Sequence, residues 1–168
     1  MIEYTFKPIG IIRSSHFESC QTPIQPVFAK GIHGTVEVFS EYADGLMDIE
    51  KFSHIYLFYY FNRAKETKLK VKPYLEDELH GIFATRSPHR PNKIGISVVK
   101  LLKIEKNILF VEDVDILDGT PLLDIKPYIA RFDTRNDVKS GWQDTVSDKV
   151  ANDRGKRDSQ KKKIDIHL

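Results

Sequence analysis

The stretch SVVKLLKIEKNILFVEDVDI, from Ser97 to Ile116, carries the strongest fold signal in this 168-residue chain. It contains two runs rich in β-branched and other apolar residues, 97–106 and 108–116, which meet at Glu105-Lys106-Asn107. This pattern is typical of a β-hairpin, and Asn107 can take the positive φ that a tight turn requires. An antiparallel pair of strands is therefore expected in the second half of the chain.

Four further segments predict strands around this hairpin. Residues 5–13 are rich in β-branched residues, 32–39 alternate between polar and apolar positions, 54–61 are apolar on both faces, and 122–126 form a short apolar run after a turn. Before Lys139 only a helical turn near 42–47 is expected. Closing antiparallel strands removes exposed edges, so the sequence favours a mainly β fold, an antiparallel β-barrel with short helical turns.

The C-terminal residues differ from this pattern, and we expect a boundary between a barrel at 4–135 and a helix with a basic tail at 136–168. Trp142, Val146 and Val150 recur every four residues, which predicts one amphipathic helix from near Ser140 to Gly155 with Trp142 as a packing anchor. Residues 149–163 hold seven basic and two acidic residues. Such a tail either binds a polyanion such as RNA or is a solvated terminus.

Several classes of protein are not indicated. The single cysteine and the absence of Cys or His clusters at ligand spacing argue against a disulfide framework or a metal site. No glycine-rich turn of the Rossmann type is present. The longest apolar run, 55–61, is too short to cross a bilayer, and the N-terminus does not resemble a signal peptide. We therefore expect a soluble cytoplasmic protein.

A second stretch, FATRSPHRPNKIGISVVKL from Phe83 to Leu101, predicts a functional loop. Pro88 and Pro91 fix φ and restrict the residues before them, so the segment is expected to be a rigid loop. Arg86 and Arg90 offer guanidiniums suited to an anion or a carboxylate. The alternative is an edge connection with solvated arginines. Residues 63–72, with six charges, are expected to form a mobile loop.

The run R-x-x-x-R-P-N-x-I-G-x-S, from Arg86 to Ser97, resembles the signature of the TrmO (YaeB-like) family of tRNA methyltransferases. Three other segments resemble that family in the same order: PIGIIRS at 8–14, GLMDIEKFSHIYLFYYFNRA at 45–64 and DILDGTPLLDIKPYI at 115–129. The resemblance covers Thr5 to Asp133. The family usually has a second proline where this chain has Lys93.

The resemblance implies a TsaA-like β-barrel methyltransferase that uses S-adenosylmethionine and works as a homodimer. The implied acceptor is the N6 nitrogen of threonylcarbamoyladenosine in the tRNA anticodon loop. The residues implied for the reacting centre are Arg86, Arg90, Asn92, Ser97, Asp118, Lys126 and Tyr128. Those implied for cofactor binding are Pro26, Val27, Phe28, Asn62, Arg63, Arg86, Ile96, Asp115, Ile116, Leu117 and Asp118.

Some of these roles have plain structural alternatives. Phe28 is equally explained as a core residue, Asp118 as the cap of an Asp-Gly turn and Ser97 as a turn residue. The threonine carboxylate of the acceptor needs a cation, for which Arg86, Arg90 and Lys126 are candidates. Two rival functions stay open: methylation of another acceptor, and a non-catalytic RNA-binding barrel that stacks bases on aromatic side chains.

Overall fold

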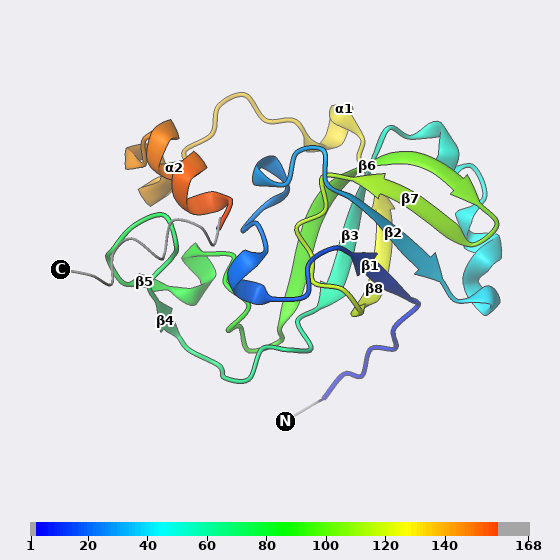
Figure 1. Cartoon of the computed structure of the whole chain (residues 1–168), viewed down its shortest axis with the longest axis horizontal. Coiled ribbons are helices and arrows are strands. Elements are labelled where there is room, and N and C mark those ends of the chain that lie inside the picture. Colours follow the sequence, from blue (N-terminus) through cyan, green and yellow to red (C-terminus); the bar gives the residue numbers. More distant parts are fainter. Residues whose placement is uncertain (1–2, 158–168) are drawn as a thin grey trace.

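The computed structural model describes residues 3–157, and six of its strands form one closed antiparallel barrel (Figure 1). Around the barrel the strands follow the order β1-β2-β7-β6-β3-β8. The barrel strands are β1 (Gly10–Ser14), β2 (His33–Val38), β3 (His54–Tyr60), β6 (Ile94–Glu105), β7 (Ile108–Glu112) and β8 (Thr120–Pro127). The predicted antiparallel β-barrel is confirmed.

Short helices occupy the connections; before Lys139 the sequence predicted only the helical turn near 42–47, which the structure forms within Ser40–Leu46. The 3-10 helices are η1 (Ser19–Gln21), η2 (Pro26–Phe28), η3 (Ser40–Leu46), η4 (Ile49–Lys51), η5 (Ile82–Ala84) and η6 (Gly141–Thr145). The α-helices are α1 (Ala130–Asp133) and α2 (Asp148–Gly155). Neither they nor the 3-10 helices of residues 3–157 have the length and apolar character that a membrane span requires.

The core is formed by the side chains at every second position of the strands, which point into the barrel. On β3, Ile55, Leu57 and Tyr59 are buried, whereas Tyr56 is half-buried and Tyr60 is exposed. The predicted strand at 54–61 is therefore present, but its apolar character on both faces does not mean that both faces are buried. A closed single-layer barrel has one interior, so only every second side chain of a strand reaches the core.

The predicted hairpin is present as β6 and β7, but its turn differs in one detail. Lys106 has the positive φ, 57°, that was expected of Asn107. The Asn107 side chain instead donates a hydrogen bond of 2.6 Å to the carbonyl of Val38. The amide is thus used to join the hairpin end to β2.

A small lobe lies beside the barrel, formed by β4 (Lys70–Val71) and β5 (His80–Gly81) together with η5 (Figure 1). Residues 63–72 were expected to be a mobile loop, yet they supply β4, and the amide of Lys68 donates to the carbonyl of His89. The prediction missed the strand because two residues are too short to produce a pattern.

The predicted helix from Ser140 to Gly155 is wrong as a single element. The chain forms η6 and α2 separately, because Ser147 is extended and caps α2, accepting a hydrogen bond from the amide of Val150. Trp142 packs on the small lobe, which confirms its expected role as an anchor: it stacks on His80 with 5.1 Å between ring centroids. Positions 158–163 of the basic tail lie outside the described residues.

Candidate active site

Arg86 lies where three segments that are distant in sequence come together. It follows η5 and its guanidinium donates a hydrogen bond to the side-chain oxygen of Gln25, the residue before η2. Burial raises the pKa values of Asp115 and Tyr59, and the positive charge of Arg86 opposes the rise in both. The arginine loop, the η2 loop and the segment 115–118 therefore converge on Arg86.

A buried chain of three polar groups lies behind Arg86. Ser97 Oγ donates to Asp115 Oδ1 at 2.6 Å, and the Tyr59 hydroxyl is 3.1 Å from Ser97 Oγ. Burial raises the pKa of Asp115 to about 7, against the opposing effects of the bond from Ser97 and the charge of Arg86. Burial also raises the pKa of Tyr59. At neutral pH this site therefore holds a carboxyl group that is close to its midpoint of ionisation.

Tyr59 also explains a glycine of the arginine motif. A Cβ on Gly95 would lie 2.2 Å from the Tyr59 ring, closer than any real contact. Gly95 pairs with Tyr59 across β3 and β6, so the ring lies flat over the glycine and directs its hydroxyl toward Ser97. Sequence analysis did not select Tyr59, although the glycine two residues before Ser97 was a signal for a closely packed ring.

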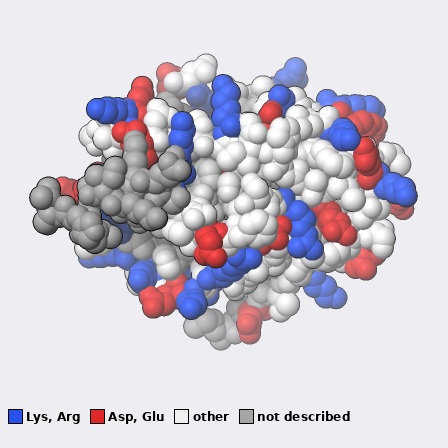
Figure 2. Space-filling view, viewed as in Figure 1, with Lys and Arg blue, Asp and Glu red and all other residues white. Residues whose placement is uncertain are grey.

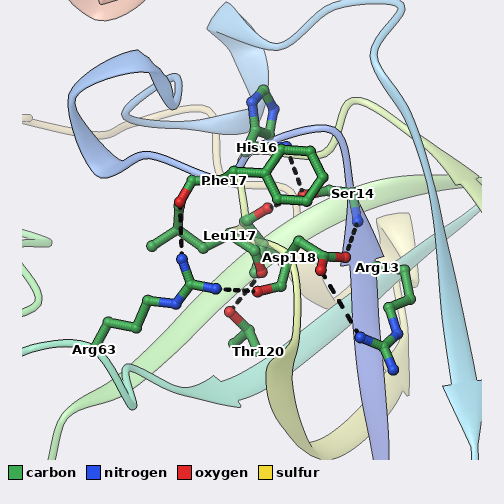
Figure 3. A network of polar contacts seen from close by, with 9 residues as sticks. Arg13, Ser14, His16, Phe17, Arg63, Leu117, Asp118 and Thr120 are labelled. Carbon is green, nitrogen blue, oxygen red and sulfur yellow. Dashed lines mark hydrogen bonds and ion pairs between the residues drawn. The ribbon is translucent and has the colours of Figure 1, made fainter.

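The turn at Asp118 is held by contacts to β1 and to Arg63 (Figure 3). Asp118 Oδ1 accepts from the amide of Ser14 at 3.2 Å, and Oδ2 lies 3.8 Å from a guanidinium nitrogen of Arg13. Arg63 donates to the carbonyls of Phe17 and Asp118 at 2.8 and 2.9 Å. These contacts favour the alternative in which the Asp118 carboxylate fixes a turn, and they make Arg63 a clamp between two loops.

The interior side of the same turn is also bonded to β1. Ser14 Oγ donates to the carbonyl of Ile116 at 2.6 Å, and His16 Nε2 donates to the carbonyl of Val114 at 2.9 Å. His16 is buried, and Ile116 is a core residue at 2% exposure. The sequence analysis missed Ser14 and His16, since both act on main-chain groups about 100 residues away.

Lys126 is an exposed residue of β8, and Tyr128 lies just beyond the end of that strand. Lys126 is opposite Tyr56 in the β3–β8 ladder and forms an exposed ion pair of 2.8 Å with Asp124. The Tyr128 ring is 5.7 Å from the Tyr56 ring. Burial raises the pKa of Tyr56, with contributions from Asp133 and Tyr128, while Arg86 lowers it. This outer face is thus electrostatically connected to the arginine loop.

Arg90 is turned into its own loop. Its guanidinium donates to the carbonyls of Ile82 and Thr85, at 3.2 and 2.6 Å, and lies over the Phe83 ring. These bonds leave Arg86 as the more available cation of the pair.

The other predicted residues occupy the rim or the surface. Pro26 and Phe28 are half-buried, Leu117 is half-buried with its carbonyl bonded to Thr120, and the exposed positions are Val27, Asn62, Asn92 and Ile96. Two cavities among the described residues lie on the outside of the barrel: one of about 450 Å³ beside η3, and one of about 590 Å³ that is lined in part by Arg13 and Ser14, next to the Asp118 turn.

Comparison with known proteins identifies a related family. Residues 11–134 match the family model described as the tRNA-methyltransferase O N-terminal domain. A probable S-adenosyl-L-methionine-binding protein of Pyrococcus abyssi is 60% identical over 137 residues, covering 82% of this chain and 74% of that protein. An S-adenosyl-L-methionine-binding protein of Archaeoglobus fulgidus is 42% identical over 133 residues, covering 79% of this chain and 95% of that protein.

Longer relatives match over part of their length. The human tRNA (adenine(37)-N6)-methyltransferase is 35% identical over 139 residues, which are 79% of this chain and 32% of that enzyme. A crystal structure of TrmO from Pseudomonas aeruginosa superimposes with a TM-score of 0.73 at 36% identity, covering 87% of this chain and 64% of that chain. This chain therefore corresponds to about a third of the human enzyme and under two thirds of the bacterial one.

Proposed function

This chain belongs to the tRNA-methyltransferase O family, and we propose that it transfers a methyl group from S-adenosylmethionine to the N6 nitrogen of threonylcarbamoyladenosine in the anticodon loop of tRNA. Relatives named as S-adenosyl-L-methionine-binding proteins support the cofactor, and those named as tRNA (adenine(37)-N6)-methyltransferases support the reaction and the acceptor base. The threonylcarbamoyl group and a cytoplasmic location are further parts of the proposal. The observation that carries it is the convergence of three segments on Arg86.

The residues around Arg86 fit the chemistry of the cofactor. Arg86 is exposed and hydrogen-bonded to a neutral amide, so its charge is available for the cofactor carboxylate. Asp115 offers a carboxyl acceptor for a hydroxyl or ammonium group, and Val27, at 75% exposure, offers an apolar surface for a ring. We assign cofactor binding to Arg86, Asp115 and η2, with Arg63 as the clamp that holds the two loops together.

The outer face beside Arg86 suits the acceptor. Lys126 forms only a surface pair with Asp124, and such pairs contribute about 0–1 kcal/mol, so a carboxylate can displace it at little cost. Tyr128 and Tyr56 lie next to it and present aromatic faces for a flipped-out base. We assign the threonine carboxylate to Lys126 and the base to this tyrosine pair.

S-adenosylmethionine supplies an electrophilic methyl group on a positively charged sulfur. The protein has to align the N6 nitrogen with that carbon and to receive the N6 proton as the new bond forms. The Asp133 carboxylate contributes to the raised pKa of Tyr56 on the acceptor side, and we assign to this pair the oxygen that takes the proton. Arg86 binds the carboxylate of the cofactor and Lys126 binds the threonine carboxylate of the acceptor. Fixing both carboxylates orients the methyl group and the N6 nitrogen toward each other.

We also propose that the chain works as a homodimer. Adjacent positions on the outside of β3 and β6 are apolar and partly exposed: Tyr60 and Ile94 at 39% and 38%, and Ile96 at 38%. Phe83, at 77% exposure, belongs to the arginine loop next to them. A second copy covering these side chains would bury apolar surface and close the open side of the site.

The assignment is tested first by titrating the protein with S-adenosylmethionine in a calorimeter, with R86A and R131A as a matched pair of arginine variants. We expect wild type and R131A to bind the cofactor equally well, because Arg131 is an exposed residue of α1 and is not among the residues assigned to the cofactor. R86A should bind it at least tenfold more weakly. No binding at millimolar cofactor would overturn the enzyme assignment.

The acceptor is tested by incubating the protein with cofactor and two tRNA preparations, one with and one without threonylcarbamoyl groups. Mass analysis of the nucleosides is expected to detect N6 methylation in the first preparation only. Methylation of both, or of neither while the cofactor binds, would assign a different acceptor.

A further inference from the structure

The C-terminal residues 141–157, which we call the C-terminal strap, contact both segments to which we assign the cofactor. The strap comprises η6, Ser147, α2 and the two residues after it, and lies beyond the matched family range of 11–134. In Figure 1 it lies against the small lobe on one side and the loop that carries η1 and η2 on the other. We call residues 15–31 the η1–η2 loop.

The first half of the strap is attached to the arginine loop. Trp142 Nε1 donates to the carbonyl of Ala84 at 2.8 Å, two residues before Arg86. The indole also stacks on His80 of β5. Trp142 thus fixes the main chain immediately before the arginine.

The second half of the strap is attached to the η1–η2 loop. The carbonyl of Gly155 accepts from the amide of Ile24 at 3.0 Å, and Arg157 donates to the carbonyl of Ser19. The guanidinium of Arg157 also lies 3.6 Å from the centre of the Tyr74 ring in the small lobe. These contacts join the loop to the lobe through the strap.

Gly155 makes the closest contact. It is buried, and a Cβ at this position would lie 2.6 Å from the Phe28 ring. The absence of a side chain at 155 therefore sets how deeply the Phe28 ring sits, and with it the position of η2. Because no barrel strand passes through the η1–η2 loop, its conformation depends on contacts of this kind.

We propose that the C-terminal strap is a positioning element of the cofactor site: Gly155 and Arg157 hold η2, Trp142 holds the chain at Arg86, and together they set the distance between the two halves of the site. This rests on the proposed cofactor assignment. It gives the C-terminal segment a role in cofactor affinity, separate from any contact of the basic tail with RNA.

The test compares two variants that add the same methyl group. G155A forces a Cβ against Phe28, whereas G45A adds a Cβ in η3 with no atom within 4 Å. We expect G155A to weaken S-adenosylmethionine binding about tenfold in calorimetry and to raise its KM. The KM for tRNA should stay at its wild-type value, and G45A should match wild type throughout.

A double-mutant cycle separates positioning from general damage. In the F28L background the smaller side chain leaves room for a Cβ, so G155A should cost less cofactor affinity there than in wild type. Equal costs in the two backgrounds, or wild-type affinity of G155A, would overturn the inference. A loss of affinity that accompanies an equal loss of tRNA binding and a lower melting temperature would also overturn it.

A second variant covers the case in which G155A does not fold. R157Q removes the charge over Tyr74 and weakens the link to Ser19, and it too should raise the cofactor KM without changing the KM for tRNA. Unchanged cofactor KM in R157Q would overturn the proposal. If wild type itself fails to bind the cofactor, the proposed function is wrong, and that result is recognisable because it appears before any strap variant is compared.

Discussion

Asp115 is a residue whose protonation near neutral pH is altered by its position in the fold. The unfolded chain releases its proton near the ordinary value of 3.8, whereas burial keeps the pKa near 7 in the folded protein. Between these values the folded state binds more protons than the unfolded state. Raising the pH across this window therefore lowers the free energy of unfolding, and above about 7 the effect is complete.

The first prediction follows from this fall in the free energy of unfolding with rising pH. The free energy of unfolding of wild type should fall between pH 4 and 7 by up to about 1.4 kcal/mol per pH unit relative to D115N, which cannot ionise. Denaturant titrations at several pH values measure it, with D44N as the control because Asp44 is exposed in η3. Parallel pH profiles for wild type and D115N would show that the carboxyl group titrates normally.

Lys126 has a close counterpart elsewhere on the barrel. Lys126 pairs with Asp124 at 2.8 Å and lies 6.0 Å from the Phe58 ring, and Lys103 pairs with Glu105 at 2.6 Å and lies 4.3 Å from the Phe110 ring. Both lysines are exposed. Only Lys126 lies beside the Tyr56–Tyr128 pair, which makes K103A a control for K126A.

The second prediction uses this pair. K126A should lower kcat/KM for threonylcarbamoylated tRNA about tenfold by raising KM, because a charge-assisted hydrogen bond to the carboxylate is lost, and K103A should behave as wild type. Steady-state methylation assays measure both. Equal effects of the two substitutions would mean that Lys126 contributes only general positive charge.

At the level of elements, β3 and β6 bring the arginine motif to Tyr59. The ring occupies the space above Gly95, and its hydroxyl meets Ser97 two residues further along the same strand. The motif residues Gly95 and Ser97 therefore act together: one makes room for the ring and the other receives its hydroxyl. This pairing depends on the register between the two strands.

The third prediction concerns that contact. G95A should lower the free energy of unfolding by about 1–3 kcal/mol, because the new Cβ cannot fit under the ring without displacing it. Chemical denaturation measures the loss. G81A adds the same group to β5 with no atom within 4 Å and should cost less; similar losses in the two variants would point to strand flexibility as the cause.

At the level of the whole molecule, the face drawn in Figure 2 shows no separate region of one charge. Basic and acidic side chains are interspersed over the described residues of the face drawn in Figure 2. The apolar positions on the outside of β3 and β6 are the more distinctive surface feature, with Tyr60 and Ile94 directly paired. This favours assembly through apolar contact over a broad electrostatic footprint.

The fourth prediction tests the proposed homodimer. I94E places a charge in the apolar surface, and an unpaired charge is costly to bury. The dissociation constant of the dimer, measured by sedimentation equilibrium, should therefore rise at least tenfold. L102E is the control on the same strand, because Leu102 has a similar exposure of 42% but lies away from Tyr60. A wild-type protein that sediments as a monomer, or an I94E dimer of unchanged strength, would contradict this interface.

The barrel itself was readable from local patterns. Its signals are the alternation in residues 32–39, the apolar runs of the hairpin and the turn residues between them. Each depends only on neighbouring residues, so it can be recognised in the sequence. The same holds for the proline-stiffened loop and its arginines. Where prediction failed, as for the mobile loop at 63–72 and the single helix at 140–155, the outcome depended on contacts with residues distant in the sequence.

The amino-acid sequence alone thus determined a closed β-barrel with a rigid arginine loop and, through its motifs, the family to which the chain belongs. Only the tertiary structure decided which polar groups face each other: Arg86 meets Gln25 across 61 residues, Ser97 meets Asp115, and the Asp118 carboxylate turns toward β1. It also decided that Gly155 of the C-terminal strap packs on Phe28. The physical reason is that strand preference is a property of neighbouring residues, whereas hydrogen bonds and ring contacts across a barrel depend on register and closure.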